Sequence, residues 1–264
     1  MSPTVSVIMP AFNAARYIEA SIRSVLSQTF DDLELIVIDD CSRDATRDIV
    51  ARIAATDARV RCIALDVNRG APAGPRNIGI RDARGPWIAF LDADDLWHPL
   101  KLEKQMAALE RTGARFCSTQ MTYFVDESST GLSAETADQI GWVTFFDQLI
   151  KLRTPLSSVV AERELFLRFP FDERLDFKAR EDLDCWLHIH EEIRRSAKIQ
   201  SPLMAYRLIP GQISGSKGPM LRRHFHVLRL YRLKSGRSLG PLAAVFTATH
   251  FGSALYFRFI RRGI

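Results

Sequence analysis

The chain has 264 residues, of which 47% are hydrophobic and 25% charged, values that are ordinary for a soluble protein with one large domain or a domain and a subdomain. The N-terminus lacks the basic and long apolar regions of a signal peptide, and the four cysteines form no C-x-x-C pair. We therefore expect a cytoplasmic protein with neither a disulfide framework nor a zinc knuckle. The net charge of +5 is gathered at the C-terminal end, and the sequence carries no nucleic-acid-binding module, so nucleic acid is not the expected partner.

Strand and helix patterns alternate over the first 124 residues. Short apolar or β-branched runs predict strands at Val5–Met9, Leu33–Asp39, Val60–Leu65, Trp87–Leu91 and Ala114–Phe124. Helical spacing and start signals predict helices at Ala15–Gln28, Asp44–Ala55, Ala71–Ala83 and Leu100–Arg111. Asp44 is the expected N-cap of the second helix, with Ser42 as the alternative. The alternation predicts an α/β fold with a mostly parallel sheet and helices on both of its faces.

Polar residues follow three of these strands. Ligands of open α/β sheets bind at the carboxyl ends of the strands. We therefore expect Pro10–Asn13, Asp39–Asp40 and Asp92–Asp95 to lie along one edge. Turns and helix caps also favour aspartate, so each cluster alone is a weak signal, but the three together favour a binding site.

The second half of the chain has a weaker pattern. Val125–Gln139 is expected to be a surface loop, Trp142–Leu152 a helix, and Phe169–Ile193 a loop that leads into an amphipathic helix. From residue 193 onward there are 14 Lys and Arg residues and no Asp or Glu. Leu242–Phe257 has no charged residue but is shorter than the roughly 20 apolar residues of a transmembrane helix. It predicts an interfacial membrane helix or, equally well, a helix packed on the domain or in a dimer interface.

Asp92-Ala93-Asp94 sets two carboxylates two residues apart, directly after a buried strand. Carboxylate oxygens suit a hard divalent cation, Mg²⁺ or Mn²⁺, which would also offset the repulsion between them. A three-residue pattern arises often by chance, so its context decides its meaning.

That context is a set of motifs in a fixed order: VSVIMPAFNAARYIEASIRSVLSQTF, IVIDDCSRDAT, NRGAPAGPRNIGI, FLDADDLWHP and AREDLDCWL. Together they resemble glycosyltransferase family 2, whose fold is the Rossmann-like GT-A fold. The resemblance implies an inverting, metal-dependent hexosyltransferase using Mn²⁺ or Mg²⁺. The implied donor is a nucleotide-sugar, first of all a UDP-sugar, and the acceptor a hydroxyl of a glycan or lipid-linked glycan in surface polysaccharide biosynthesis.

The resemblance also implies how the chain is divided. Residues 1–218 would form the GT-A domain, with 1–124 as the nucleotide-sugar-binding half and 125–218 as the acceptor-binding half. Residues 219–264 would form a basic, amphipathic helical tail. This tail would hold the enzyme at the cytoplasmic face of the inner membrane.

Roles in donor binding are carried over position by position. Pro10, Ala11, Phe12 and Asn13 would line the nucleotide, with Ala11 and Phe12 beside the base. Asp40 would hydrogen-bond the base, supported by Asp39, while Arg76 and Asn77 would lie near the ribose and diphosphate. Asp92 and Ala93 would contact the nucleoside, and Asp94 would coordinate the metal. Asp95 would cap the following segment or join the metal, and His98 lies near enough in sequence to approach it.

Asp182 is the implied general base of transfer, because one carboxylate must take the proton of the attacking hydroxyl. Neighbouring Glu181 would raise its pKa or face elsewhere, and Asp184 is an alternative base. The acidic run also suits a helix N-terminus without any catalysis. Cys41 stands where the family often has glycine, so its turn must accommodate a side chain. Arg207, Ser214 and Lys217 would contact phosphate from a loop closing over the donor or, equally well, belong to a solvated or membrane-facing loop.

Two other functions remain open at this point. A sugar-nucleotidyltransferase would share the α/β core, but its Gly-rich N-terminal loop is missing here. A catalytically inactive nucleotide-sugar-binding scaffold would be expected to have lost at least one of four aspartates that this chain keeps, namely Asp40, Asp92, Asp94 and Asp182.

Overall fold

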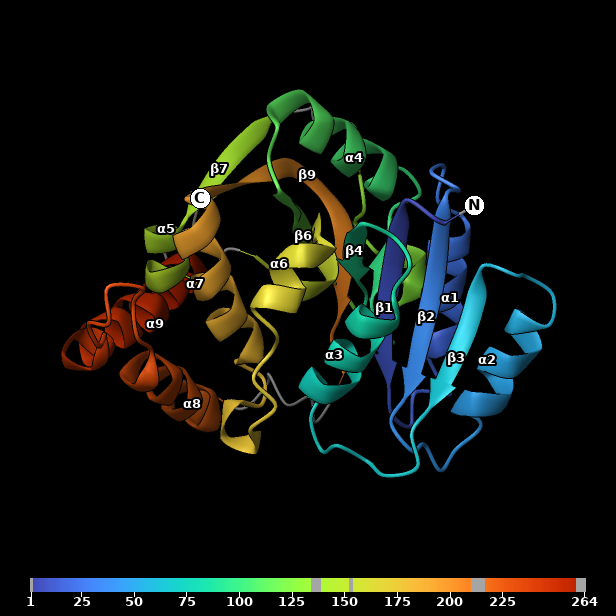
Figure 1. Cartoon of the computed structure of the whole chain (residues 1–264), viewed down its shortest axis with the longest axis horizontal. Coiled ribbons are helices and arrows are strands. Elements are labelled where there is room, and N and C mark those ends of the chain that lie inside the picture. Colours follow the sequence, from blue (N-terminus) through green and yellow to red (C-terminus); the bar gives the residue numbers. More distant parts are fainter. Residues whose placement is uncertain (1, 134–138, 152–153, 210–216, 260–264) are drawn as a thin grey trace.

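One mixed sheet runs through the chain, with helices on both of its faces (Figure 1). The computed structural model describes residues 2–133, 139–151, 154–209 and 217–259. Its strands are β1 (Val5–Ala11), β2 (Leu33–Asp39), β3 (Val60–Ala64), β4 (Trp87–Phe90), β5 (Leu96–Trp97), β6 (Phe116–Phe124), β7 (Ile140–Thr144), β8 (Val160–Glu162) and β9 (Arg195–Arg207). Its helices are α1 (Ile18–Leu26), α2 (Thr46–Ala54), α3 (Ala73–Asp82), α4 (Lys101–Thr112), α5 (Phe145–Ile150), α6 (Arg163–Arg168), α7 (Glu181–Ile193), α8 (Lys217–Leu230) and α9 (Ala243–Phe259).

The predicted α/β fold class is confirmed. The sheet has the order β3-β2-β1-β4-β8-β6-β9-β5, and β7 pairs with β9. Strands β1 to β4 are parallel to one another, as the alternation predicts, because helices connect them. The second half adds antiparallel pairings of β8 with β4 and of β7 with β9.

Two hydrophobic cores lie on the two faces of this sheet. On one face, Val7 and Met9 of β1 pack with α1, α2 and α4 through residues such as Ile22 and Leu102. On the other, Ile8 packs with α3, α6 and α7. Successive residues of β1 therefore enter opposite cores, because side chains alternate along a strand. Both faces of β1 and β2 are buried, which explains their continuous apolar runs.

The prediction of a helix over Trp142–Leu152 is wrong at its start. Ile140–Thr144 is the strand β7, which pairs with β9, and α5 begins only at Phe145. Thr144 caps α5: its hydroxyl accepts from the backbone N–H of Asp147, whose carboxylate accepts from the N–H of Thr144. This capping box fixes where the strand ends and the helix begins.

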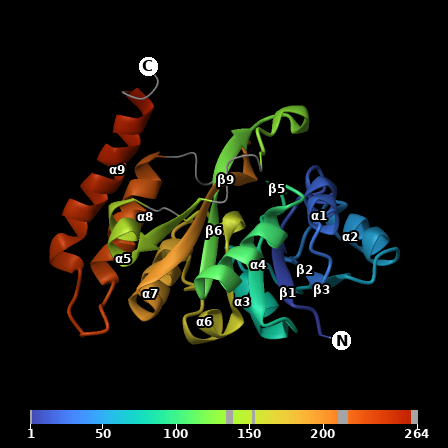
Figure 2. The same ribbon diagram turned by 90° about the horizontal axis from the view of Figure 1, so that it is seen from above.

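The two C-terminal helices form a separate layer at the end of the sheet away from β1, β2 and β3 (Figure 2). Val227 and Tyr231, with Ala243, pack against Leu183 and Leu187 of α7 in a third hydrophobic cluster. The helix prediction for Leu242–Phe257 is thus matched by α9, whose described part packs against the domain. No helix in the described part of the chain is long and apolar enough to span a bilayer.

Candidate functional site

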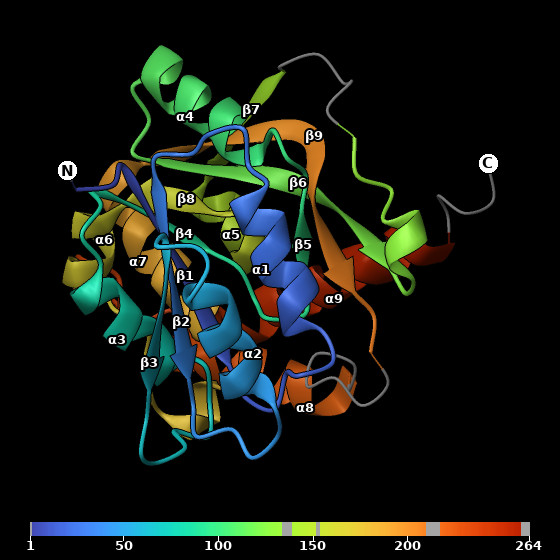
Figure 3. The same cartoon turned by 90° about the vertical axis from the view of Figure 1, so that its right-hand side faces the viewer.

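The carboxyl ends of β1, β2 and β4 meet at one edge, as predicted (Figure 3). The strand register pairs Ala11 with Asp39, and Ile8 with Phe90. Asn13 then joins the first two loops: its N–H donates to the Ser42 hydroxyl at 2.9 Å, and its side-chain oxygen accepts from the Arg43 N–H at 2.8 Å. Asn13 has a φ of 50°, a left-handed conformation that asparagine tolerates well.

A cavity of about 540 Å³ opens beside these loops. It is lined by Phe12, Cys41, Arg43, Asp66, Val67 and Asn68. Phe12 has half of its surface exposed, so its ring is available to stack on a planar ligand. Sequence reasoning missed the contribution of 66–68, although the run begins directly after the predicted strand at Val60–Leu65, where a ligand-binding loop is expected.

The two aspartates after β2 have different environments. Asp40 accepts a hydrogen bond from the Arg69 N–H at 2.8 Å, and burial raises the pKa of its carboxyl. Asp39 is fully buried, and its Oδ2 accepts bonds from the Arg47 guanidinium and the Ser42 N–H. The structure therefore gives Asp39 a supporting place behind the loop, and contact of Asp40 with a base stays a prediction.

Cys41 adopts a φ of 62°, in the left-handed region where glycine is at ease. This is the strain that the departure from glycine predicts. Its sulfur lies 3.6 Å from the carbonyl oxygen of Asp66, and the side chain lines the cavity. Helix α2 begins nearby at Thr46, and its N-cap position is Ala45, so neither Asp44 nor the alternative Ser42 is the N-cap. Asp44 instead accepts a hydrogen bond from the Thr46 N–H, one residue beyond the cap.

The Asp92–Asp95 loop is fixed through its backbone. The Asp92 N–H donates to the Ser157 hydroxyl at 3.1 Å, and the Ser21 hydroxyl donates to the carbonyl of Ala93 at 2.9 Å. The Arg207 guanidinium donates to the carbonyl of Asp94 at 2.7 Å. Ala93 is itself buried, so its side chain offers little surface for contact with a ligand. Since three distant elements hold the loop, its carboxylates have a set position.

Asp95 neither caps the following segment nor faces the loop's open side. It is buried, and its two oxygens accept from the Ser157 hydroxyl at 2.7 Å and the Arg207 N–H at 3.1 Å. Burial, with the nearby charges of Asp94 and Asp92, raises the pKa of Asp95 well above its usual range. Asp95 thus connects the loop to the end of β9 through a hydrogen bond.

Arg76 connects the two acidic parts of the site. Its guanidinium donates to Asp92 at 2.8 Å and to Glu181 at 2.7 Å. The arginine is buried, whereas the side chain of Asp92 is 33% exposed. The arginine therefore compensates two of the carboxylates and joins the end of β4 to the start of α7.

Asn77 is engaged by the loop that precedes α7. Its amide donates to the carbonyl of Phe171 and to Glu173, while its oxygen accepts from the Phe171 N–H. These bonds use both amide hydrogens, so Asn77 holds this loop in place, and a position near the ribose and diphosphate stays a prediction.

Asp182 lies in the first turn of α7 and is partly exposed. Burial, together with the charge of Glu181, raises the pKa of Asp182 to about 6, against the opposing charges of Arg180 and Arg76. Ala179, three residues earlier, has a φ of 64°, a strained conformation for alanine. A carboxyl with a pKa near neutrality, set at the end of a strained turn, has the properties of a general base.

The donor set at the loop fits a divalent cation that is shared with a ligand. Among the described residues no group of three or more His, Cys, Asp or Glu could hold a metal by itself. Asp92 and Asp94 supply oxygens, and Mg²⁺ or Mn²⁺ commonly completes its shell with water and phosphate oxygens. His98 is used locally, because its ring accepts from the Leu100 N–H at 3.1 Å.

Arg207 ends β9 and is buried, and it pairs with Glu127 at 2.8 Å as well as with the Asp94 carbonyl. It thus holds the Asp92–Asp95 loop in place through the backbone of Asp94. Ser214 and the side chain of Lys217, named with Arg207 as phosphate contacts, lie outside the described residues.

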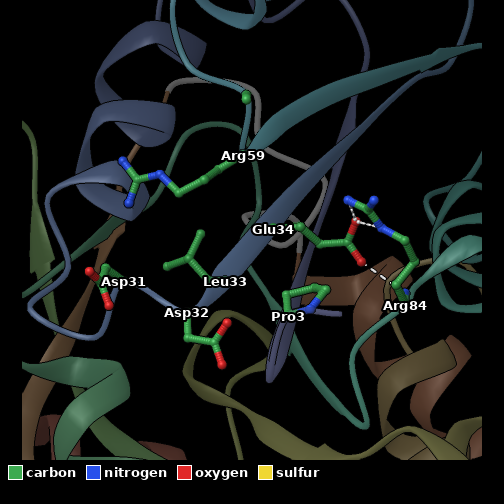
Figure 4. A pocket seen from close by; sticks show the side chains of 8 residues that line it. Pro3, Asp31, Asp32, Leu33, Glu34, Arg59 and Arg84 are labelled. Carbon is green, nitrogen blue, oxygen red and sulfur yellow. Dashed lines mark hydrogen bonds and ion pairs between the residues drawn. The ribbon is translucent and has the colours of Figure 1, made fainter. Parts of the chain in front are cut away.

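A second cavity, of about 280 Å³, lies at the opposite edge of the sheet, at the amino end of β2 (Figure 4). Its most buried acidic group, Glu34, is already bound by the Ser6 hydroxyl and by Arg61 and Arg84. Hydrogen bonds from Ser6 and Arg84 hold the pKa of Glu34 at about 2 in spite of its burial. This cavity is far from the clustered strand ends and offers no comparable chemistry.

The model for glycosyl transferase family 2 matches residues 6–175. A relative from Escherichia coli, the UDP-Glc:alpha-D-GlcNAc-diphosphoundecaprenol beta-1,3-glucosyltransferase WfgD, is 34% identical over 85% of this chain and 85% of its own. TuaG of Bacillus subtilis, assigned by its name to teichuronic acid biosynthesis, is 32% identical over 86% of this chain and 88% of its own. Staphylococcus aureus TarS in complex with UDP-GlcNAc has the same fold, with a TM-score of 0.72 and 20% identity over 98% of this chain and 73% of that structure.

Proposed function

The chain belongs to glycosyltransferase family 2, and from that premise we propose that it transfers a sugar from a UDP-sugar to a hydroxyl of a lipid-linked glycan, with inversion at the anomeric carbon. The observation that carries the proposal is Arg76. It joins the Asp92–Asp95 loop to the turn that holds Asp182, so donor and base groups belong to one site.

The donor would lie across the strand ends. The base would stack on Phe12 in the large cavity and bond to Asp40, and the diphosphate would extend toward Asp94. Mn²⁺ or Mg²⁺ held by Asp94 would neutralise the charge that develops on the leaving diphosphate. Asp92 would contact the nucleoside while Arg76 fixes its orientation.

Asp182 would accept the proton of the attacking hydroxyl. Its pKa of about 6 leaves it mostly ionised at neutral pH, yet basic enough to take a proton. Glu181 is occupied by Arg76 and would tune Asp182 by its charge alone. The leaving nucleoside diphosphate needs no protonated acid, because it departs as a stabilised anion.

Thermal unfolding with nucleotides tests the donor site. UDP at about 100 times its Kd should stabilise the protein by roughly 2.7 kcal/mol. We expect that gain with UDP and Mn²⁺, a smaller one with dTDP, GDP or CMP, and its loss in Asp94→Ala. Asp48→Ala, an exposed change on α2, is the matched control and should keep the gain. No stabilisation by any nucleotide would contradict the proposal.

The proposals for the acceptor class and for the cellular location rest on the named relatives and on the charge of the C-terminal region. WfgD is named for a lipid-linked acceptor, and the region from residue 193 onward is entirely basic among its charged residues. Leu242 and Val245 are half exposed, next to the exposed Arg232 and Arg237 of the α8–α9 connection. We assign this surface to contact with anionic lipid at the cytoplasmic face of the inner membrane.

Vesicle sedimentation tests the membrane contact. The protein should bind vesicles rich in phosphatidylglycerol and not vesicles of phosphatidylcholine. The double variant Arg232→Gln/Arg237→Gln should lose most of that binding, since each basic residue contributes about 1 kcal/mol near an anionic surface. Equal binding by the variant would exclude this surface.

A further inference from the structure

A group of buried polar side chains lies where the start of α7 meets α8 and α9. We call it the Arg180 cluster: Arg180, His224 of α8, and Thr247 and His250 of α9. The His224 and His250 rings are 4.2 Å apart, and Thr247 shares a face of α9 with His250 because the two are three residues apart. Apart from the effect of the Arg180 charge on Asp182, none of the roles assigned above uses this cluster.

The cluster holds polar atoms that the protein does not satisfy. Both ring nitrogens of His224, the hydroxyl of Thr247 and Nε of Arg180 are buried without a hydrogen-bond partner. His224 is completely buried, and Arg180 is only 8% exposed. Buried polar groups are nearly always paired, because each orphan costs free energy. Several orphans together indicate that a polar ligand completes the site.

The charge of Arg180 is only partly compensated. In the part of the chain that the structure describes, no carboxylate forms an ion pair with it, although Asp182 and Glu181 lie near enough to favour its charged form. Burial lowers the pKa of Arg180, and those two charges oppose the shift. A buried guanidinium that forms no ion pair is costly, so an anion would complete its surroundings.

The surrounding groups are donors or neutral. Burial, then the neighbouring His250 and Arg180, hold the pKa of His224 at about 2, and burial with Arg180 and Lys151 holds that of His250 at about 4. Both rings are therefore neutral at pH 7, and each carries one N–H to donate. Guanidinium, imidazole and hydroxyl groups together match the oxygens of a phosphate.

Position distinguishes this anion from the donor. Arg76 approaches the start of α7 from the side of Asp92, whereas Arg180 faces α8 and α9. Helices α8 and α9 lie on the other side of α7 from β1 and β2 (Figure 1). Both arginines act on Asp182. An anion on Arg180 is thus next to the proposed base, on the side remote from the Asp92–Asp95 loop.

We propose that the Arg180 cluster binds the phosphate or diphosphate through which the acceptor glycan is attached to its lipid. This deepens the proposed function and rests on it. Binding there would place the first sugar of the acceptor beside Asp182 and direct the lipid toward the surface formed by α8 and α9.

Binding of geranyl diphosphate, a prenyl diphosphate without a sugar, tests the cluster. It is titrated calorimetrically into protein saturated with UDP and Mn²⁺, so that the donor site is filled. We expect wild-type binding to weaken about ten- to a hundredfold in Arg180→Gln, the loss of a charge-assisted bond. Arg222→Gln, an exposed change of the same charge on α8, is the control and should alter the affinity less than twofold.

His224→Phe separates binding from folding. Removing unsatisfied ring nitrogens from a buried place should leave the melting temperature equal or higher, while the affinity for geranyl diphosphate falls. Absence of wild-type binding, unchanged binding in Arg180→Gln, or equal losses in Arg180→Gln and Arg222→Gln would overturn the proposal.

Two further measurements identify the source of the phosphate and protect the proposed function. Arg180→Gln should bind phosphatidylglycerol vesicles like the wild type. If this variant loses vesicle binding but keeps geranyl diphosphate binding, the cluster binds a lipid headgroup, and the acceptor site is refuted. UDP affinity should stay within twofold in every variant. Failure of UDP to bind the wild type would reject the donor site itself, independently of the cluster.

Discussion

Replacing Cys41 by glycine should stabilise the protein. With a φ of 62°, the cysteine occupies a left-handed conformation that costs a residue with a Cβ roughly 1–2 kcal/mol. Glycine removes that strain but loses roughly 0.5–1 kcal/mol through its freer unfolded chain. The net gain therefore lies between about 0 and 1.5 kcal/mol, with a midpoint of about 0.75 kcal/mol. For a chain of this size the midpoint corresponds to a rise of about 1.5–3 °C in melting temperature.

Differential scanning calorimetry of three proteins isolates the cause. Cys41→Ala loses the same sulfur contact with the Asp66 carbonyl but keeps its Cβ, so it should not be stabilised. Only Cys41→Gly should melt at a higher temperature than the wild type. If the alanine and glycine variants melt at the same temperature, backbone strain at this turn is not the reason, and the argument fails.

Three more expectations concern the same site. Arg76→Gln should lower the free energy of unfolding in urea by about 3–5 kcal/mol, because it leaves Glu181 buried without its counter-ion. Arg81→Gln, on the exposed side of α3, should change it by less than about 0.5 kcal/mol. Similar losses in both variants would refute the network. Transfer activity should fall as pH drops through about 6, where Asp182 takes up a proton. Glu181→Gln removes a charge that raises the pKa of Asp182, so it should move this acid limb to lower pH, and a limb that stays in place would exclude Asp182 as its source. N-ethylmaleimide should modify Cys41, and UDP with Mn²⁺ should slow that reaction, as mass spectrometry would show; unchanged labelling would separate the cavity from the nucleotide site.

The donor edge is largely predictable from sequence because its signals are local. Apolar runs that end in aspartate mark β2 and β4, and parallel pairing brings their ends together without further information. The left-handed turn at Cys41 also follows from a residue type that stands where glycine is usual.

Long-range pairings were beyond that reasoning. Arg76 and Glu181 are 105 residues apart, and Asp95 and the Arg207 N–H are 112 apart. A sequence pattern gives no partner at such separations. It therefore predicts a local cap or a metal role for Asp95 instead of its bonds to Ser157 and Arg207, and it does not reveal that Asn77 bonds to Phe171. The end of β7, from Trp142 to Thr144, has a helical pattern in the sequence, and only its pairing with β9, far along the chain, makes it a strand.

The anomeric configuration of the product tests the central claim most directly. With the UDP-sugar selected by the thermal screen and a lipid-diphosphate-linked glycan as acceptor, proton NMR would follow the transferred sugar in wild type, Asp182→Asn and Asp184→Asn. We predict inversion, a loss of at least about a hundredfold in kcat for Asp182→Asn, and near wild-type activity for Asp184→Asn. Retention of configuration, or full activity of Asp182→Asn, would contradict the account.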